Sequence, residues 1–245
     1  MNTLNTLDPQ DWNTVAPYFS ALADEYLKAD DVSGWLLRGS ELEKTLGEAG
    51  SWANRAKSED TTNSEAEKAY LNFVQQIVPA WSVAAQGLKT KLLGVPGYEP
   101  DAGHMQFLRR LRNDADLFRA ENVPIQAQLQ TLANEYDKRT GPMGVTVNGQ
   151  RMTVPEAEAL WQSPDRHVRE EAWRAVMDCW SEARAELDAL FLKQLPLRRK
   201  LAENAGLPDY RAYMWRAMRR FDYTPAETKL STKRLKAKLC PLRSG

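Results

Sequence analysis

Zinc-dependent hydrolysis is the first chemistry to consider, because it needs at least three His, Glu, Asp or Cys ligands around one metal ion. The chain has two histidines, His104 and His167, more than sixty residues apart. Neither lies in a His-Glu-x-x-His motif, which places two imidazoles on one helix face. The run 167–171, His-Val-Arg-Glu-Glu, comes closest to the inverted motif His-x-x-Glu-His, but Glu171 stands where the second histidine is required. We therefore interpret this run as a solvated helix face and assign no metal ligand and no catalytic residue.

The sequence also offers no good candidate for a catalytic nucleophile. Cys179 lies within a helical apolar stripe, which favours a small core residue over a reactive thiol. With Cys240 as the second cysteine, the sequence predicts no disulfide framework. There is no Gly-x-Ser-x-Gly elbow and no phosphate-binding glycine loop. Trp173 and Trp180 are one heptad apart, so we expect both to pack in the core rather than to form a ligand cage.

Composition points to an ordinary globular protein. Of the 245 residues, 42% are hydrophobic and 27% are charged. No apolar run approaches the roughly 20 residues that span a bilayer. The N-terminal sequence lacks a basic segment followed by an apolar one, so we expect no secretory signal, no membrane partner and a cytoplasmic location.

Charge is distributed unevenly along the chain. Residues 229–245 contain six Lys or Arg and no acid, which leaves 27 basic and 33 acidic residues over 1–228, a net charge of −6. A solvated, disordered terminus is the simpler interpretation of this tail, and a nucleic-acid-binding arm is the alternative. We reject nucleic acid as the main partner, because no aromatic residues interleave the charges of the tail and no basic patch continues it.

Helical periodicity dominates the sequence. Asp8-Pro9 predicts the start of an amphipathic helix that reaches about Lys28. Further helices are predicted from Ser33 and around Phe73, and the loop at 94–97 separates them from later ones. Later helical spacing covers 107–111 and 124–136, and a long helix with a three-and-four apolar stripe follows Ser163-Pro164-Asp165 up to residue 190.

One segment alternates with a period of two instead. Residues 145–153 centre on Asn148-Gly149, the strongest short signal for a β-hairpin. Thr153-Val154-Pro155-Glu156 then predicts a capping box at the start of a helix. The predicted fold class is all-α, a multi-helix lobe with one small β-hairpin near residues 144–153.

Several of these segments together resemble a known family. The resemblance begins at 117–125, Leu-Phe-Arg-Ala-Glu-Asn-Val-Pro-Ile, passes through the Asn148-Gly149 turn, and continues over 163–173. The run 201–213, with the residues just before it, resembles the pattern R-x-x-x-A-x-x-x-G-x-x-x-Y-x-x-Y. Over roughly residues 10–228 the chain looks like the pre-catalytic part of oligoendopeptidase F and thimet-oligopeptidase-like zinc peptidases.

The resemblance implies helical lobes around a deep channel that admits oligopeptides, with zinc held by His-Glu-x-x-His and a further Glu. None of those ligands maps onto a position here, so the expected cofactor complement of this chain is none. The implied organisation is an N-terminal helical domain (1–115), a helical region with the hairpin (116–200), the start of the catalytic-domain helices (201–228) and an aberrant basic tail (229–245).

Two functions follow as alternatives. The first is a fragment of a zinc endopeptidase that is inactive alone. A related possibility is a complementing half, which becomes active when a separate chain supplies the zinc domain. The second is a non-catalytic helical module that binds peptides or proteins. In either case substrate-binding residues stay unknown, and we expect self-association through the region around Trp173 to Trp215, because a missing lobe would uncover apolar surface.

A frameshift would explain the basic tail. Thr224-Pro225-Ala226-Glu227 is a capping box that should start a helix, yet the Lys-rich sequence after it lacks a clean apolar stripe. With suitable codons, a shift by one nucleotide converts Lys233, Lys236 and Lys238 into Glu and gives helical apolar spacing. The hypothesis requires codons ending in G at Thr232, Leu235 and Ala237, and an open shifted frame that leads to a His-Glu-x-x-His region.

Overall fold

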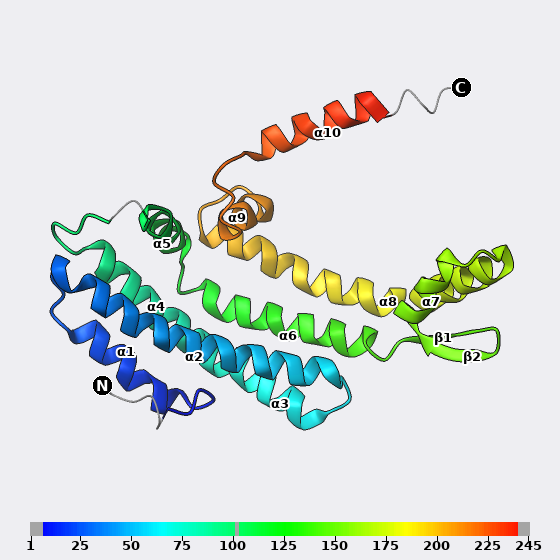
Figure 1. The fold of residues 1–245 in the computed structure, drawn as a ribbon, viewed down its shortest axis with the longest axis horizontal. Coiled ribbons are helices and arrows are strands. Elements are labelled where there is room, and N and C mark those ends of the chain that lie inside the picture. Colours follow the sequence, from blue (N-terminus) through cyan, green and yellow to red (C-terminus); the bar gives the residue numbers. More distant parts are fainter. Residues whose placement is uncertain (1–6, 101–102, 240–245) are drawn as a thin grey trace.

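The computed structural model describes residues 7–100 and 103–239, with side chains up to residue 232, so expectations for the first six residues and for Cys240 lie outside the described part. Apart from one two-stranded sheet, the regular structure is helical, which confirms the predicted class. No described helix is both long and apolar enough to cross a bilayer. The elements (Figure 1) are α1 (Trp12–Asp24), η2 (Ala29–Asp31), α2 (Val32–Glu59), α3 (Ser64–Asn72), η3 (Phe73–Ile77), α4 (Val78–Leu93), α5 (Met105–Leu117), α6 (Asn122–Thr140), β1 (Gly144–Val147), β2 (Gln150–Thr153), α7 (Val154–Ala159), η4 (Leu160–Gln162), α8 (Arg166–Asn204), α9 (Tyr210–Ala217) and α10 (Pro225–Leu239).

The first helix is shorter than its sequence predicts. Asp11, not Asp8, is its N-cap, and the Asp11 carboxylate accepts from the backbone N–H of Asn13 at 3.0 Å. Asp8 is held in the preceding turn, where its N–H donates to the Thr14 hydroxyl at 2.9 Å. At the other end, the Lys91 ammonium donates to the carbonyls of Leu22 and Ala23, at 3.1 and 2.6 Å. This cation satisfies carbonyls that the helix leaves unpaired, so α1 ends at Asp24 and not near residue 28.

The largest hydrophobic cluster lies among α1, α2, η3, α4 and α5. Leu46 and Val15 are fully buried in it, and the Trp35 indole donates to the Leu22 carbonyl at 3.0 Å. Between α3 and α4 the chain makes a π turn, η3, in which the Val78 N–H donates to the Phe73 carbonyl. Phe73 packs over Gly50, where a Cβ would come within 2.6 Å of the Phe73 ring.

The long helix α8 connects two further clusters. It contains 39 residues. At roughly 1.5 Å per residue it extends for about 58 Å. The helix α6 runs beside it (Figure 1). The N-terminal half of α8 packs Ala172 and Val176 against the hairpin and α7, whereas its C-terminal end packs Leu201 and Ala202 against the start of α6 and against α9. Because one helix belongs to both clusters, it fixes the distance between them.

The hairpin forms as its sequence predicts. Asn148 and Gly149 have φ angles of 51° and 72°. These positive values fit a two-residue type I′ turn. Val145 pairs with Met152, and Val147 is fully buried against α8. Thr153 and Glu156 form the predicted capping box of α7.

Three expectations for the C-terminal half need correction or refinement. Trp173 is 50% exposed. It follows the buried Ala172 by one residue and so points about 100° away from the core. Trp180, by contrast, is half-buried against the hairpin cluster, as is Cys179.

After the capping box at Thr224, the backbone stays helical to Leu239, so the segment that suggested a disordered terminus is largely part of α10.

Candidate functional site

The two histidines are too far apart to share a metal ion. His167 lies in the first turn of α8, whereas His104 precedes α5, which contacts α9 at the opposite end of α8. The length of α8 therefore separates them, on the order of 50 Å. Among the described residues, no group of three or more His, Cys, Asp or Glu side chains could hold a metal.

The run 167–171 has a structural use for its polar side chains. Glu170 pairs with Arg174 at 2.8 Å, and this ion pair lowers the pKa of the Glu170 carboxyl below its usual value. The Glu171 carboxylate accepts from the Asn148 N–H at 2.7 Å and so holds the hairpin turn against α8. These contacts agree with a solvated helix face.

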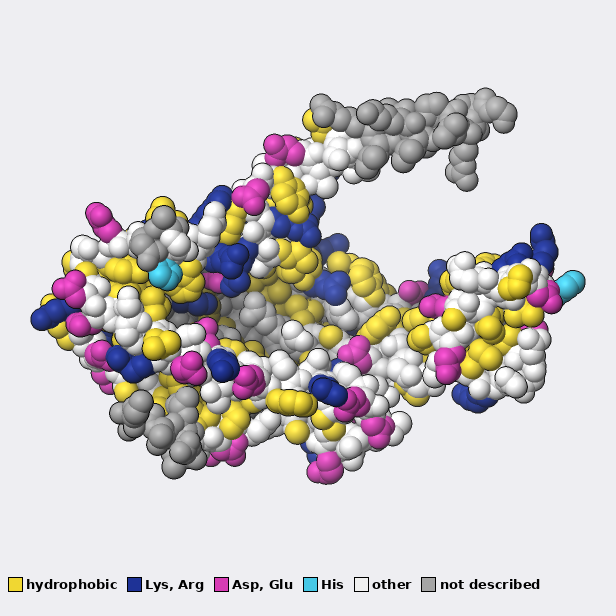
Figure 2. All heavy atoms as spheres, in the orientation of Figure 1, with side chains coloured by type: hydrophobic (Ala, Val, Ile, Leu, Met, Phe, Trp, Pro, Cys, Tyr) yellow, Lys and Arg dark blue, Asp and Glu magenta, His cyan; other side chains and the backbone are white. Residues whose placement is uncertain are grey.

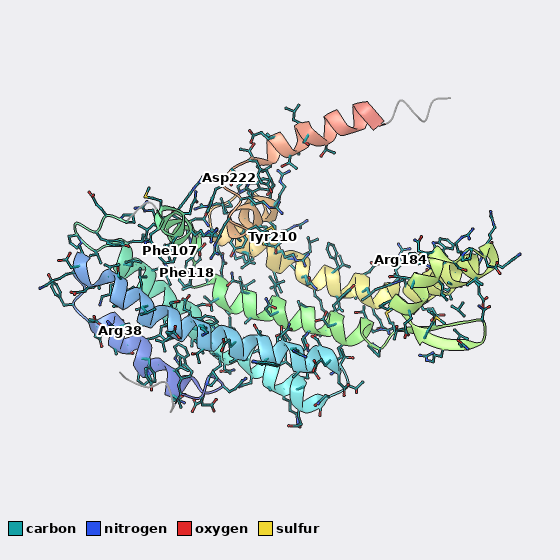
Figure 3. The ribbon with its side chains drawn as sticks, in the orientation of Figure 1. Arg38, Phe107, Phe118, Arg184, Tyr210 and Asp222 are labelled. Atoms are coloured by element: carbon teal, nitrogen blue, oxygen red, sulfur yellow. The ribbon has the colours of Figure 1, made fainter. Side chains whose placement is uncertain are left out.

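A hollow lies over the C-terminal half of α8. Figure 2 shows the molecule concave between α9, with the first turn of α10, and the lobe that carries the hairpin. In Figure 3, Arg184 on α8 and Tyr210 at the start of α9 lie at the edge of this hollow. Residues 184, 191 and 198 are seven apart and therefore share one face of the helix. Arg184 places this face of α8 toward the hollow.

This part of α8 has exposed apolar side chains close to a backbone carbonyl that lacks its helical partner. Phe191 and Leu192 are 51% and 64% exposed. Pro196 lies within α8, and because proline has no N–H it leaves the Leu192 carbonyl without its helical hydrogen bond. An apolar surface next to an unpaired carbonyl suits a peptide, which offers both side chains and N–H donors.

Arg198 supplies the charge at this face. Its guanidinium carbon lies 5.9 Å from the ring centroid of Phe191 and 5.7 Å from that of Tyr210. Both separations are within the range of a cation–π interaction. Arg198 also donates to the neutral side-chain oxygen of Gln194. We call the group Phe191, Leu192, Arg198 and Tyr210 the Arg198 site.

Buried polar contacts among α6, α8 and α9 hold the Arg198 site in place. Tyr210 stacks on Tyr213 with ring centroids 6.2 Å apart, and the Tyr213 hydroxyl accepts from Gln126 of α6 at 3.0 Å. Burial raises the pKa of Tyr213, so this phenol stays protonated at neutral pH. The buried Asn122 donates to the Leu201 carbonyl at 3.0 Å and accepts from Asn204 at 2.8 Å. Together these bonds fix α6, α8 and α9 to one another.

The structure gives a physical reason for the pattern R-x-x-x-A-x-x-x-G-x-x-x-Y-x-x-Y. Arg198 contacts the Tyr210 ring, and Ala202 is 1% exposed where α8 meets its neighbours. Gly206 has a φ of 68°. This left-handed conformation ends a helix, and other residues rarely adopt it. Tyr213 fills the core of the cluster at this end of the molecule.

On its other side, α9 is fastened to α5 by ion pairs. Arg219 pairs with Asp114 at 2.6 Å, and Arg216 lies 3.7 Å from Asp116. Asp114 raises the pKa of the Arg219 guanidinium further. Arg220 instead lies over the Trp215 ring, 4.9 Å from its centroid. These contacts attach the C-terminal end of α9 and the turn after it to α5.

Sequence reasoning identified neither Arg198 nor Phe191 as a site residue. The pattern that includes Arg198 was visible, but its contact with Tyr210 crosses the bend between α8 and α9. The exposure of Phe191 and Leu192 depends on which face of α8 is covered by α6, which periodicity alone does not reveal.

Comparison with known proteins supports the fold. No protein-family model matches the sequence, and no curated protein matches it significantly. Three solved structures share its fold. A protein assigned as oligoendopeptidase F from Bacillus anthracis str. Ames is 18% identical with a TM-score of 0.81, over 88% of this chain and 40% of that one. PZ peptidase A with inhibitor 2 is 14% identical with a TM-score of 0.86, over 94% and 42%.

The third structure, an oligoendopeptidase F assignment from crystals grown by microfluidic seeding, is 19% identical with a TM-score of 0.87, over 96% of this chain and 42% of that one. The fold is thus that of part of the oligoendopeptidase F and PZ peptidase structures. The chain spans about two-fifths of the length of each protein that it matches.

Proposed function

We propose that this chain forms the helical, channel-lining part of an oligoendopeptidase F-type zinc endopeptidase and has no peptidase activity by itself. The observation that carries the proposal is the match of nearly the whole chain to a peptidase structure, at a TM-score of 0.87, over only 42% of that structure. The described residues also lack a group of potential metal ligands. In the family that the sequence resembles, zinc and its ligands come from a different part of the protein.

In this proposal the hollow over α8 is one wall of the path that oligopeptides follow. The exposed Phe191 and Leu192, the free Leu192 carbonyl and the half-buried Arg198 are groups that a peptide can contact. The catalytic residues would belong to the remaining part of the peptidase, in the same or a complementing chain. A cytoplasmic location remains a prediction.

Metal analysis and a cleavage assay test the proposal together. Protein purified without chelator and then dialysed against micromolar zinc should contain far less than one equivalent of metal, because two distant histidines cannot build a tetrahedral site. It should also leave a quenched fluorescent oligopeptide uncleaved. One equivalent of tightly bound zinc, with turnover that a chelator abolishes, would refute the proposal.

A non-catalytic peptide- or protein-binding module is the second candidate. It is favoured by the Arg198 site itself, whose four residues all lie within this chain and whose Tyr210 stacks on Tyr213, which accepts a hydrogen bond from Gln126. Two measurements together distinguish the two functions: calorimetric titration with oligopeptides, and a peptidase assay after mixing with a separate catalytic chain. Stable peptide binding that is unchanged by a co-expressed His-Glu-x-x-His-containing chain favours the module, whereas gain of peptidase activity on mixing favours the split enzyme.

A further inference from the structure

The C-terminal part of the chain, which includes the end of α8 and α9, is cationic, whereas the preceding part is acidic. Residues 1–190 contain 19 Lys or Arg and 29 Asp or Glu, a net charge of −10. Residues 191–224, which form the end of α8, α9 and the loop after it, contain 8 basic and 3 acidic residues, a net charge of +5. Residues 225–245 contain 6 basic and 1 acidic residue and also have a net charge of +5. The segment 191–224 is therefore a cationic part of a chain whose first 190 residues are acidic, and such a segment attracts anionic partners.

Several cations of this segment have no carboxylate partner within the described residues. Lys193, Arg198, Arg199 and Arg220 make no ion pair there, although Arg211, Arg216 and Arg219 do. Arg198 differs from the others because it is half-buried and held between two aromatic rings. Its only hydrogen-bond partner in that part of the chain is the uncharged Gln194. A guanidinium fixed in this way is ready to bind a carboxylate with little loss of side-chain entropy.

We propose that the Arg198 site binds a carboxylate of an oligopeptide and so gives the hollow a preference for acidic peptides. The proposal rests on the proposed function only in taking a peptide as the occupant. Both an acidic side chain and a C-terminal carboxylate have the required chemistry, since arginine binds either one through two parallel N–H donors.

The spacing of the site sets the register of the bound peptide. The guanidinium carbon of Arg198 lies 5.9 Å from the ring centroid of Phe191. In an extended peptide, side chains on one face are two residues apart, which is about 6.6 Å at roughly 3.3 Å per residue. A peptide side chain that packs on Phe191 therefore precedes the carboxylate by about two positions.

Calorimetric titration at low salt tests both the charge preference and the register. Three octapeptides carry the same leucine and differ at the position two residues later: one has Glu and a C-terminal amide, one has Gln and an amide, and one ends there with a free carboxylate. The protein variants are Arg198→Gln, Arg198→Lys and the control Arg174→Gln. The Arg174 side chain is 66% exposed on the same helix, and its removal changes net charge equally. It lies about 36 Å from Arg198 along the helix axis. Far-UV circular dichroism confirms that each variant is folded.

The Glu peptide should bind about tenfold more tightly than the Gln peptide, as expected for a charge-assisted hydrogen-bonded pair. Arg198→Gln should abolish that ratio, Arg198→Lys should retain part of it, and Arg174→Gln should leave it unchanged. The arm with the free carboxylate shows whether a chain end serves as well as a side chain.

Equal affinity for the Glu and Gln peptides would overturn the inference and leave the proposed function standing. An equal loss of preference in Arg174→Gln and Arg198→Gln would also overturn it, because the effect would then come from net charge. Failure of every peptide to bind at millimolar concentration would refute both the carboxylate site and the role of the hollow as a peptide path.

Discussion

Replacing Asp137 by Ala should destabilise the protein more than replacing its partner Lys57 by Met. The Lys57 side chain is 4% exposed, and its ammonium lies 2.6 Å from the Asp137 carboxylate on α6 and 4.7 Å from the centroid of the Tyr70 ring. Asp137 is 49% exposed. Removal of Asp137 leaves a buried cation without its counter-ion, whereas removal of Lys57 leaves a carboxylate that water can reach.

The magnitudes follow from these exposures. Breaking a fully buried ion pair costs about 3–5 kcal/mol, and the half-exposed Asp137 reduces this to about 2 kcal/mol for Asp137→Ala. Lys57→Met keeps the aliphatic contact with Tyr70 and removes the desolvated charge, so we expect a cost below about 1 kcal/mol. In a chain of this size, about 2 kcal/mol corresponds to a decrease in Tm of about 4–8 °C.

Urea denaturation followed by circular dichroism at pH 7 measures both variants, with Asp137→Asn as the isosteric control. The double variant should be no less stable than Asp137→Ala, because the buried charge is then absent. If Lys57→Met costs as much as Asp137→Ala or more, the argument from an uncompensated buried charge is wrong.

Two further predictions concern acid stability and association. The hydrogen bond from Lys138 lowers the pKa of Glu67 below 4.5. The stabilising contribution of this carboxylate is therefore present above that pH and is lost as the pH falls through the folded-state pKa. The free energy of unfolding, measured from pH 6 to pH 3, should fall less steeply for Glu67→Gln, and an identical slope would contradict this. We also expect self-association, because Trp173, Phe191, Leu192 and Met218 are each at least 50% exposed. Apolar surface of this kind marks sites of association when it is contiguous. Static light scattering should show a mass above 27.8 kDa, and a monomer at high concentration that binds no hydrophobic dye would count against it.

Local chemistry made much of this fold predictable. The Asn148-Gly149 turn and the Thr153 capping box depend on neighbouring residues alone, and both form where the sequence places them. The start of α1 was misplaced because Asp8 and Asp11 are both suitable caps. The choice between them depends on the Thr14 hydroxyl, which holds Asp8 in a turn.

Contacts between distant residues account for what could not be predicted. Lys57 and Asp137 are 80 residues apart, and nothing in the sequence around Lys57 distinguishes it from a solvated lysine at the end of a helix. The candidate site also depends on contacts between residues that are distant in the sequence. Arg198 and Phe191 become a site only because α6 covers the opposite face of α8 and α9 brings Tyr210 back over it.

The π turn at Phe73–Ile77 has a consequence for sequence comparison. Such a turn contains one residue more than an α turn, so apolar positions before and after it differ in phase by about 100°. A related chain with an uninterrupted α-helix here would have one residue fewer. It would also have no need of glycine opposite, where the Phe73 ring now occupies the space of a Cβ at Gly50. An alignment of this chain with such a relative therefore needs a one-residue gap between Asn72 and Val78, without which the faces of α4 are assigned incorrectly.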